Sequence, residues 1–149
     1  MKVDVQTEIE INRPRAEVAA YAADLDNTTD WYANIESVEW KTPKPLEAGS
    51  RVAFVARFMG RRLSYTYEIR DHVEGQRLVM STADGPFAME TTYEWEDISE
   101  GSTRMRLRNR GNPSGFANVV GSVMTGAMRR ANRKDLARLK QILESGGQG

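Results

Sequence analysis

An α+β fold with an antiparallel sheet is the fold class that the sequence predicts. Three observations predict it: apolar and polar residues alternate through most of residues 3–109, turn signals separate the alternating runs, and the period becomes helical over residues 114–144. A meander of strands followed by one long amphipathic helix buries both apolar faces when the helix packs on the sheet. The 149 residues suffice for one such core. We expect a single domain over residues 1–144 and a flexible Gly-rich tail over residues 145–149.

The first elements predicted are a strand and two short helices. Residues 3–11 alternate in polarity, as a half-buried strand does. Pro14 suits the first turn of a helix, because the N–H that it lacks needs no partner there. Residues 26–30 are polar and turn-like, so we expect a short second helix that carries Trp31 and Tyr32. Residues 35–40 have the pattern of a strand, which Pro43 ends.

The middle of the chain has the pattern of successive hairpins. Alternating runs begin at Val52, and turn signals follow at Gly60-Arg61, at residues 74–75, at residues 84–86 and at residues 99–101. From Ser114 to Glu144 the apolar residues form a helical stripe. A helix of this length would extend for about 45 Å.

The composition excludes several classes of protein. The chain has 21 Lys and Arg against 21 Asp and Glu, no Cys and a single His. Balanced charge argues against a nucleic-acid partner, and the missing Cys and scarce His argue against thiolate or His-rich metal sites. No Gly-rich phosphate loop precedes a helix, and no apolar run reaches the about 20 residues that cross a membrane. We expect a cytoplasmic protein without cofactor, metal or stable membrane insertion.

The inward face of the predicted sheet is the main candidate for a binding site. Its aromatic and Met side chains could simply fill a core. Hydroxyl and amide groups on the same face favour a pocket instead, because buried polar groups need partners. Gly121 and Gly126 in the facing helix leave room for one, although close packing of helix on sheet would also explain them. The candidate ligand-binding residues are Trp31, Phe54, Tyr65, Tyr67, Met80, Phe87, Met89, Thr91, Tyr93, Leu107, Asn109, Val120, Val123, Met124 and Ala127.

A second signal is the excess of basic residues in the C-terminal third. Arg104, Arg106, Arg108 and Arg110 recur at period 2 and therefore share the outer face of one strand. A polyanion-binding face is one interpretation. A ladder of cross-strand ion pairs is the other, with Glu94 opposite Arg104 and Glu90 opposite Arg108.

The order of motifs resembles the START-like (SRPBCC) superfamily, in its polyketide cyclase/dehydrase and lipid-transport branch. The resemblance covers Val3 to Glu144. It rests on Arg13 to Val18, Asp24, Trp31, Gly49, Arg51, Val52, Glu74 to Leu78, Gly85-Pro86, Tyr93, Trp95, Thr103-Arg104, Gly115-Phe116, Asp135-Leu136, Leu139-Lys140 and Leu143. Ala33 departs from the pattern, since relatives often carry Pro there.

The resemblance implies a helix-grip fold. A curved antiparallel sheet wraps around the long C-terminal helix, two short helices follow the first strand, and an elongated cavity lies between sheet and helix. It also implies a cavity entrance near Trp31 and Tyr32, which we expect to act as a mobile lid.

The first functional hypothesis is binding of a small hydrophobic molecule, a lipid, quinone or polyketide-like compound, by a monomer or weak homodimer. The alternative is an aromatase/cyclase-like enzyme, in which Tyr65, Tyr67, Tyr93 and Asn109 would orient and protonate a polyketide-like chain. It ranks second because a phenol with a pKa near 10 is a poor base at neutral pH. A protein-interaction module that uses a sheet edge or the basic helix face is the second alternative.

Overall fold

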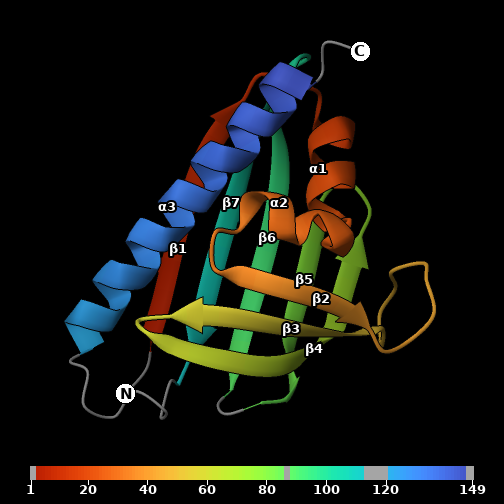
Figure 1. The fold of residues 1–149 in the computed structure, drawn as a ribbon. Helices are drawn as coiled ribbons and strands as arrows, with labels where there is room; N and C mark the ends of the chain where they lie inside the picture. The colour runs from red at the N-terminus through yellow and green to blue at the C-terminus, as the bar shows by residue number, and fades with distance from the viewer. Residues whose placement is uncertain (1–2, 86–87, 113–120, 147–149) are drawn as a thin grey trace.

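The computed structural model describes residues 3–85, 88–112 and 121–146. In these residues seven strands form one antiparallel sheet in the order β1-β7-β6-β5-β4-β3-β2 (Figure 1). The strands are β1 (Val3–Ile11), β2 (Ile35–Trp40), β3 (Arg51–Phe58), β4 (Arg61–Val73), β5 (Arg77–Asp84), β6 (Met89–Ser99) and β7 (Ser102–Gly111). The sheet twists so strongly that β2, β3 and β4 run across the direction of β1, β7 and β6 (Figure 1).

The helices lie on one face of this sheet. They are α1 (Arg15–Ala23), a 3-10 turn η1 (Leu25–Asn27), the short α2 (Thr28–Trp31) and the long α3 (Gly121–Gly146). α3 runs alongside β1, while α1 and α2 cover the neighbouring part of the sheet (Figure 1). This is the expected helix-grip arrangement, with two short α-helices, separated by η1, between the first and second strands.

Buried apolar side chains from both layers form the main core. Leu136, Leu139 and Leu143 of α3 meet the inward residues of the sheet, and Trp31 joins them from α2. A smaller cluster joins Met124 to Val3 and Val5, with Phe58, Leu63 and Met128 packed against it. The smaller cluster thus connects the first part of α3 to β1 and to the β3–β4 hairpin.

The turn between β3 and β4 corrects one prediction. The two residues outside the strands are Met59 and Gly60, rather than Gly60 and Arg61. Both have positive φ, 51° and 80°, which suits the twist of a two-residue hairpin. Arg61 pairs with Phe58 as the first residue of β4.

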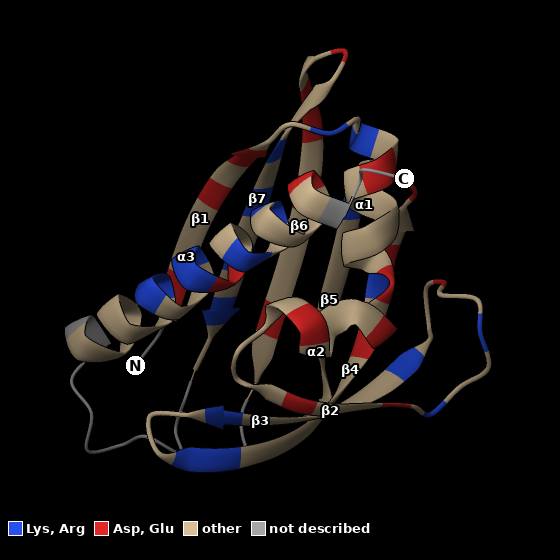
Figure 2. Ribbon diagram, turned by 45° about the horizontal axis from the view of Figure 1, so that its top comes forward, with Lys and Arg blue, Asp and Glu red and all other residues tan. Residues whose placement is uncertain are grey.

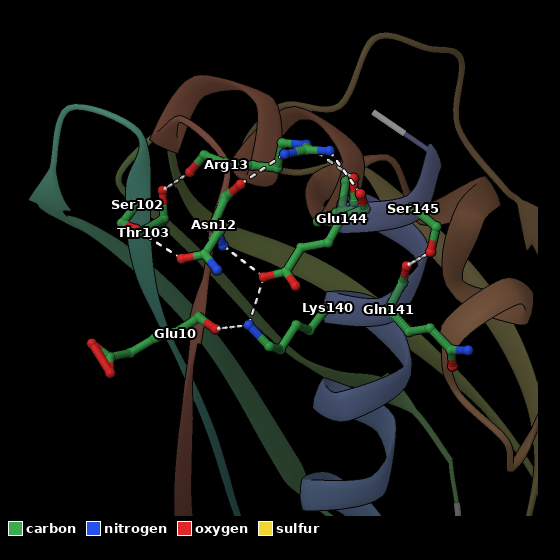
Figure 3. A network of polar contacts seen from close by, with 10 residues as sticks. Glu10, Asn12, Arg13, Ser102, Thr103, Lys140, Gln141, Glu144 and Ser145 are labelled. Atoms are coloured by element: carbon green, nitrogen blue, oxygen red, sulfur yellow. Dashed lines mark hydrogen bonds and ion pairs between the residues drawn. The ribbon is translucent and has the colours of Figure 1, made fainter. Parts of the chain in front are cut away.

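The end of α3 is held to β1 and to the segment that follows it (Figure 3). Arg13 donates from Nε to the Leu143 carbonyl oxygen at 3.1 Å and from Nη2 to the Glu144 carbonyl oxygen at 2.7 Å. Lys140 Nζ donates to the Glu10 carbonyl oxygen, and the Asn12 N–H donates to the Glu144 carboxylate. Arg13 therefore serves carbonyls that a helix end leaves without intrahelical partners. The helix extends to Gly146, two residues beyond the predicted end.

The arginines of β7 form ion pairs on the outer face of the sheet. Basic positions along β7 and acidic positions along β1 are visible in Figure 2. β7 pairs with β1 on one side and β6 on the other. The β6–β7 register differs from the prediction by two residues. Glu96, not Glu94, lies opposite Arg104, and Arg106 lies opposite Glu94. Glu96 accepts from both Arg104 and Arg106, and Asp4 of β1 accepts twice from Arg108.

Candidate functional site

A pocket of about 130 Å³ lies between the inward face of the sheet and α3. All seven strands and α3 contribute to its wall, and polar groups reach it from the sheet, from α2 and the residues that follow it, and from α3. This volume is below the roughly 300–1,000 Å³ of pockets for drug-sized ligands, and resembles the roughly 150 Å³ cavity that holds one benzene ring. The pocket as it stands accommodates a group the size of one ring.

Three polar side chains on the sheet satisfy one another. Thr91 Oγ1 donates to Asn109 Oδ1 at 2.7 Å, so the Tyr67 hydroxyl, 2.8 Å from Thr91 Oγ1, is the donor of the second bond. Burial raises the pKa of Tyr67 to about 12, and the Thr91 contact only partly offsets this rise. Tyr67 therefore stays protonated at neutral pH and does not act as a base.

A second pair of hydroxyls joins α2 to the sheet. Tyr32, directly after α2, and Tyr93 of β6 approach to 2.8 Å between their hydroxyl oxygens. Burial raises the pKa of both phenols, and it raises the pKa of Tyr65 beside them as well. All three tyrosines line the pocket as protonated hydrogen-bonding groups.

The charged group of the pocket is Asp135 of α3. Its side chain lines the pocket, the residue is 2% exposed, and its Oδ1 accepts from the Ala33 N–H at 3.1 Å. Loss of hydration on burial raises the pKa of Asp135 to about 6, and the Ala33 N–H and Lys134 offset only part of the rise. At neutral pH the pocket therefore contains a carboxylate that is close to its titration range.

Asn132 lies one turn before Asp135 and also lines the pocket. The residue is 4% exposed, and its Nδ2 has no hydrogen-bond partner among the residues that the structure describes. Arg57 and Arg110 also contribute to the wall, and each forms an ion pair with a neighbouring carboxylate, Glu36 and Glu90 respectively.

The predicted site residues differ in where the structure places them. Most of those that are described line the pocket: Phe54, Tyr65, Tyr67, Met80, Met89, Thr91, Tyr93, Asn109 and Met124. Trp31 and Leu107 are buried in the core behind the wall. Ala127 is partly buried on α3 outside the wall, and Phe87 and Val120 lie outside the described residues.

Val123 differs most from its predicted place. It is 55% exposed, because it sits about 100° around the helix from Met124, whose side chain takes the inward position. Trp31, expected in a lid, is 1% exposed and packs against Tyr32 at 4.3 Å between ring centroids. Tyr32, rather than Trp31, faces the pocket.

The sequence reasoning missed Asn132 and Asp135 as pocket residues. Both lie on the apolar stripe of α3, near Ala131 and Leu136, and polar residues within such a stripe are a usable signal. Within residues 3–85, 88–112 and 121–146, no three His, Asp or Glu side chains gather as metal ligands. None of the described helices is long and apolar enough to cross a membrane.

A family model described as polyketide cyclase / dehydrase and lipid transport matches residues 2–144. The chain belongs to this family. Its membership agrees with the START-like resemblance of the motifs and with the helix-grip fold. Among curated proteins, none matches the sequence.

Solved structures share the fold at low sequence identity. A protein from Thermus thermophilus superposes with a TM-score of 0.81 at 21% identity, over 96% of this chain and 98% of its own. The Zhui aromatase/cyclase from a Streptomyces species gives 0.79 at 14% identity, over 97% and 94%. A START superfamily protein from Mycobacterium smegmatis gives 0.81 at 12% identity, over 95% and 97%. Sequence identities this low show only that these proteins share a fold. They point to no particular ligand for this member of the polyketide cyclase/dehydrase and lipid transport family.

Proposed function

We propose that this protein binds a small, mostly apolar ligand of lipid, quinone or polyketide type in the pocket between the sheet and α3. The observation that carries the proposal is the composition of the pocket wall. Apolar and aromatic side chains surround it, and a few polar groups from separate elements converge on it. Such a wall is typical of sites for small organic molecules. Family membership supports the same class of function.

The volume limits what binds without rearrangement. One ring or a short chain fits in about 130 Å³, and a longer ligand requires a wider space, for example between the first part of α3 and the β3–β4 hairpin. The contacts between them are apolar, through Met124, Met128, Phe58 and Leu63. The polar anchors of Figure 3 hold the opposite end of α3.

Native mass spectrometry of the protein purified from its own cells tests for a co-purifying ligand, and titration with ethylbenzene tests the pocket directly. Ala131→Phe fills the pocket and should abolish ethylbenzene binding, because Ala131 lines the wall. Ala137→Phe is the matched control on the exposed face of the same helix and should bind as the wild type does. Equal binding by both variants would refute the proposal.

Asp135 supports a second candidate function, proton transfer to or from a bound carbonyl compound. A buried carboxylate with a pKa of about 6 can accept a proton from a carbon next to a carbonyl and return it. The tyrosines are less suited to this step, because burial raises their pKa values. This candidate assigns the proton to Asp135 rather than to Tyr65, Tyr67 or Tyr93, which the sequence suggested.

Exchange of the methyl protons of acetophenone in deuterated buffer, followed by NMR, tests this second function. The wild type should accelerate the exchange, and Asp135→Asn should remove the acceleration while acetophenone still binds. No acceleration by the wild type at saturating acetophenone would leave binding as the only proposed function.

A further inference from the structure

The Asn132 amide is the polar group of the pocket whose hydrogen bonding the described protein does not complete. The residue is almost fully buried, its side chain lines the pocket, and its Nδ2 has no partner among the described residues. Buried amide donors in folded proteins nearly always have a partner. A rotation of the amide by 180° exchanges its nitrogen and oxygen, so the donor can be presented to the pocket itself. An acceptor bound in the pocket would complete the hydrogen bonding of this amide.

Asp135 constrains what that acceptor can be. It lies three residues after Asn132 on the same face of α3 and lines the same pocket. One of its oxygens accepts from the Ala33 N–H, and no Lys or Arg side chain forms an ion pair with it within the described part of the chain. A ligand carboxylate placed at Asn132 would meet this negative charge in a poorly hydrated space, where repulsion between like charges is strong.

The cations of the pocket wall do not offset this repulsion. Arg57 and Arg110 already form ion pairs with Glu36 and Glu90. The groups that face Asp135 from the other elements are the neutral phenols Tyr32 and Tyr93. A neutral oxygen acceptor is therefore favoured over an anionic one.

We propose that Asn132 donates a hydrogen bond to the carbonyl oxygen of a neutral, ring-sized ketone or quinone group, and that Asp135 excludes carboxylates such as fatty acids. This inference rests on the proposed function and narrows its ligand class from lipids in general to neutral carbonyl compounds. It makes Asn132 a determinant of specificity rather than of binding as such.

Three probes of similar size separate the possibilities: ethylbenzene without an acceptor, acetophenone with a carbonyl oxygen, and benzoate with a carboxylate. Acetophenone is better hydrated than ethylbenzene, so the informative quantity is how the ratio of their dissociation constants changes between variants. Asn132→Leu keeps the approximate shape and removes the donor. This variant should weaken acetophenone binding relative to ethylbenzene binding by about tenfold, which is the effect of one lost hydrogen bond. Arg133→Leu, at the neighbouring exposed position, should leave the ratio unchanged.

The benzoate measurements test whether Asp135 excludes carboxylates. Benzoate should not bind the wild type at pH 7.5, and Asp135→Asn should allow it to bind. If Asn132→Leu does not fold, the side-chain amide signals of Asn132 in the wild type serve instead, and they should shift with acetophenone and not with ethylbenzene.

The outcomes distinguish this inference from the proposed function. The inference would be overturned if Asn132→Leu lost affinity for acetophenone and ethylbenzene equally. It would also be overturned if the wild type bound benzoate about as well as acetophenone. In both cases the proposed binding function would stand. Failure of the wild type to bind either neutral probe would overturn the proposed function and this inference with it.

Discussion

Tyr32 and Tyr93 come from segments 61 residues apart, and their hydroxyl oxygens lie 2.8 Å from each other at the wall of the pocket. Tyr93 also packs against Trp31, at 5.7 Å between ring centroids. The segment that follows η1 is thus joined to the centre of the sheet by one hydrogen bond and by aromatic packing. The pair ties the position of α2 to the position of the pocket.

The hydroxyl pair should show thermodynamic coupling. Tyr32→Phe and Tyr93→Phe each leave one buried hydroxyl without its partner and should cost about 1–2 kcal/mol of unfolding free energy. The double variant removes both polar groups and should cost less than the two single costs added together. Urea unfolding of the four proteins measures this, with Tyr21→Phe as a control, because the Tyr21 hydroxyl is exposed and 3.4 Å from Asp30. Strictly additive costs would show that the two hydroxyls do not interact.

Asp135 should make stability depend on pH. Its pKa is raised from 3.8 to about 6 in the folded protein, so the folded state holds the proton more tightly than the unfolded chain does. The contribution of Asp135 to the free energy of unfolding is therefore fully present below about pH 4 and is lost as the pH rises through about 6. The loss approaches about 3 kcal/mol, since each pKa unit corresponds to about 1.36 kcal/mol.

Asp135→Asn removes this loss and should stabilise the protein at pH 8, with little difference from the wild type at pH 4. Urea unfolding between these pH values measures the difference. Asp84→Asn, at the exposed end of β5, is the matched control. A difference between Asp135→Asn and the wild type that stays constant from pH 4 to 8 would contradict the assignment of the titration to Asp135.

The pattern of alternation predicts the strands well because each strand buries one face, whereas register depends on local details that alternation does not encode. The β6–β7 register is an example. It shifts between Asp97 and Ser99, where the pairing is irregular, and the hairpin turns after Ser99, which pairs with Ser102. The predicted partner of Arg104 was therefore two residues too early. The arginines still face outward, because a shift of two residues keeps every side chain on its face.

The pocket wall on the sheet was predictable for the same reason, and the wall on α3 was less so. A drifting apolar stripe leaves the rotation of the helix uncertain by about one residue, which is why Val123 was expected to face inward together with Met124. Asn132 and Asp135 were missed because a polar residue within a stripe is usually taken as a solvated position. Only the packing of α2 against α3 places the Ala33 N–H near Asp135 and makes the position inward.

Trp31 should report on ligand binding from behind the wall. It contacts Tyr32 and Tyr93, which both line the pocket, so a bound acetophenone should change its fluorescence. Trp31→Phe should remove more of this response than Trp40→Phe does. In the wild type, the Trp40 indole donates to Asp26 at 3.0 Å on an exposed part of the surface. An equal response from the two variants would show that the segment of Trp31 does not sense the pocket, and the lid role expected for it would be wrong.

Replacing arginines on the outer face of β7 distinguishes ligand binding from polyanion binding. Arg108 donates to Asp4 at 2.8 and 2.7 Å, and Arg106 donates to Glu96 at 2.9 Å. Exposed ion pairs contribute only about 0–1 kcal/mol each. The double variant Arg106→Gln, Arg108→Gln should therefore cost at most about 2 kcal/mol of unfolding free energy and leave ethylbenzene binding unchanged.

The same variant tests for nucleic-acid binding, together with a matched pair on α3. Arg130 and Arg133 are exposed and have no ion-pair partner among the described residues, so they are available to a polyanion. The ion pairs of β7 already neutralise its arginines, and we expect no shift of DNA or RNA by the wild type in a gel at low salt. A polyanion-binding protein would show a shift of micromolar or tighter affinity that falls steeply with salt. A salt-sensitive shift abolished by Arg106→Gln, Arg108→Gln and retained by Arg130→Gln, Arg133→Gln would assign polyanion binding to the sheet and displace the small-ligand proposal.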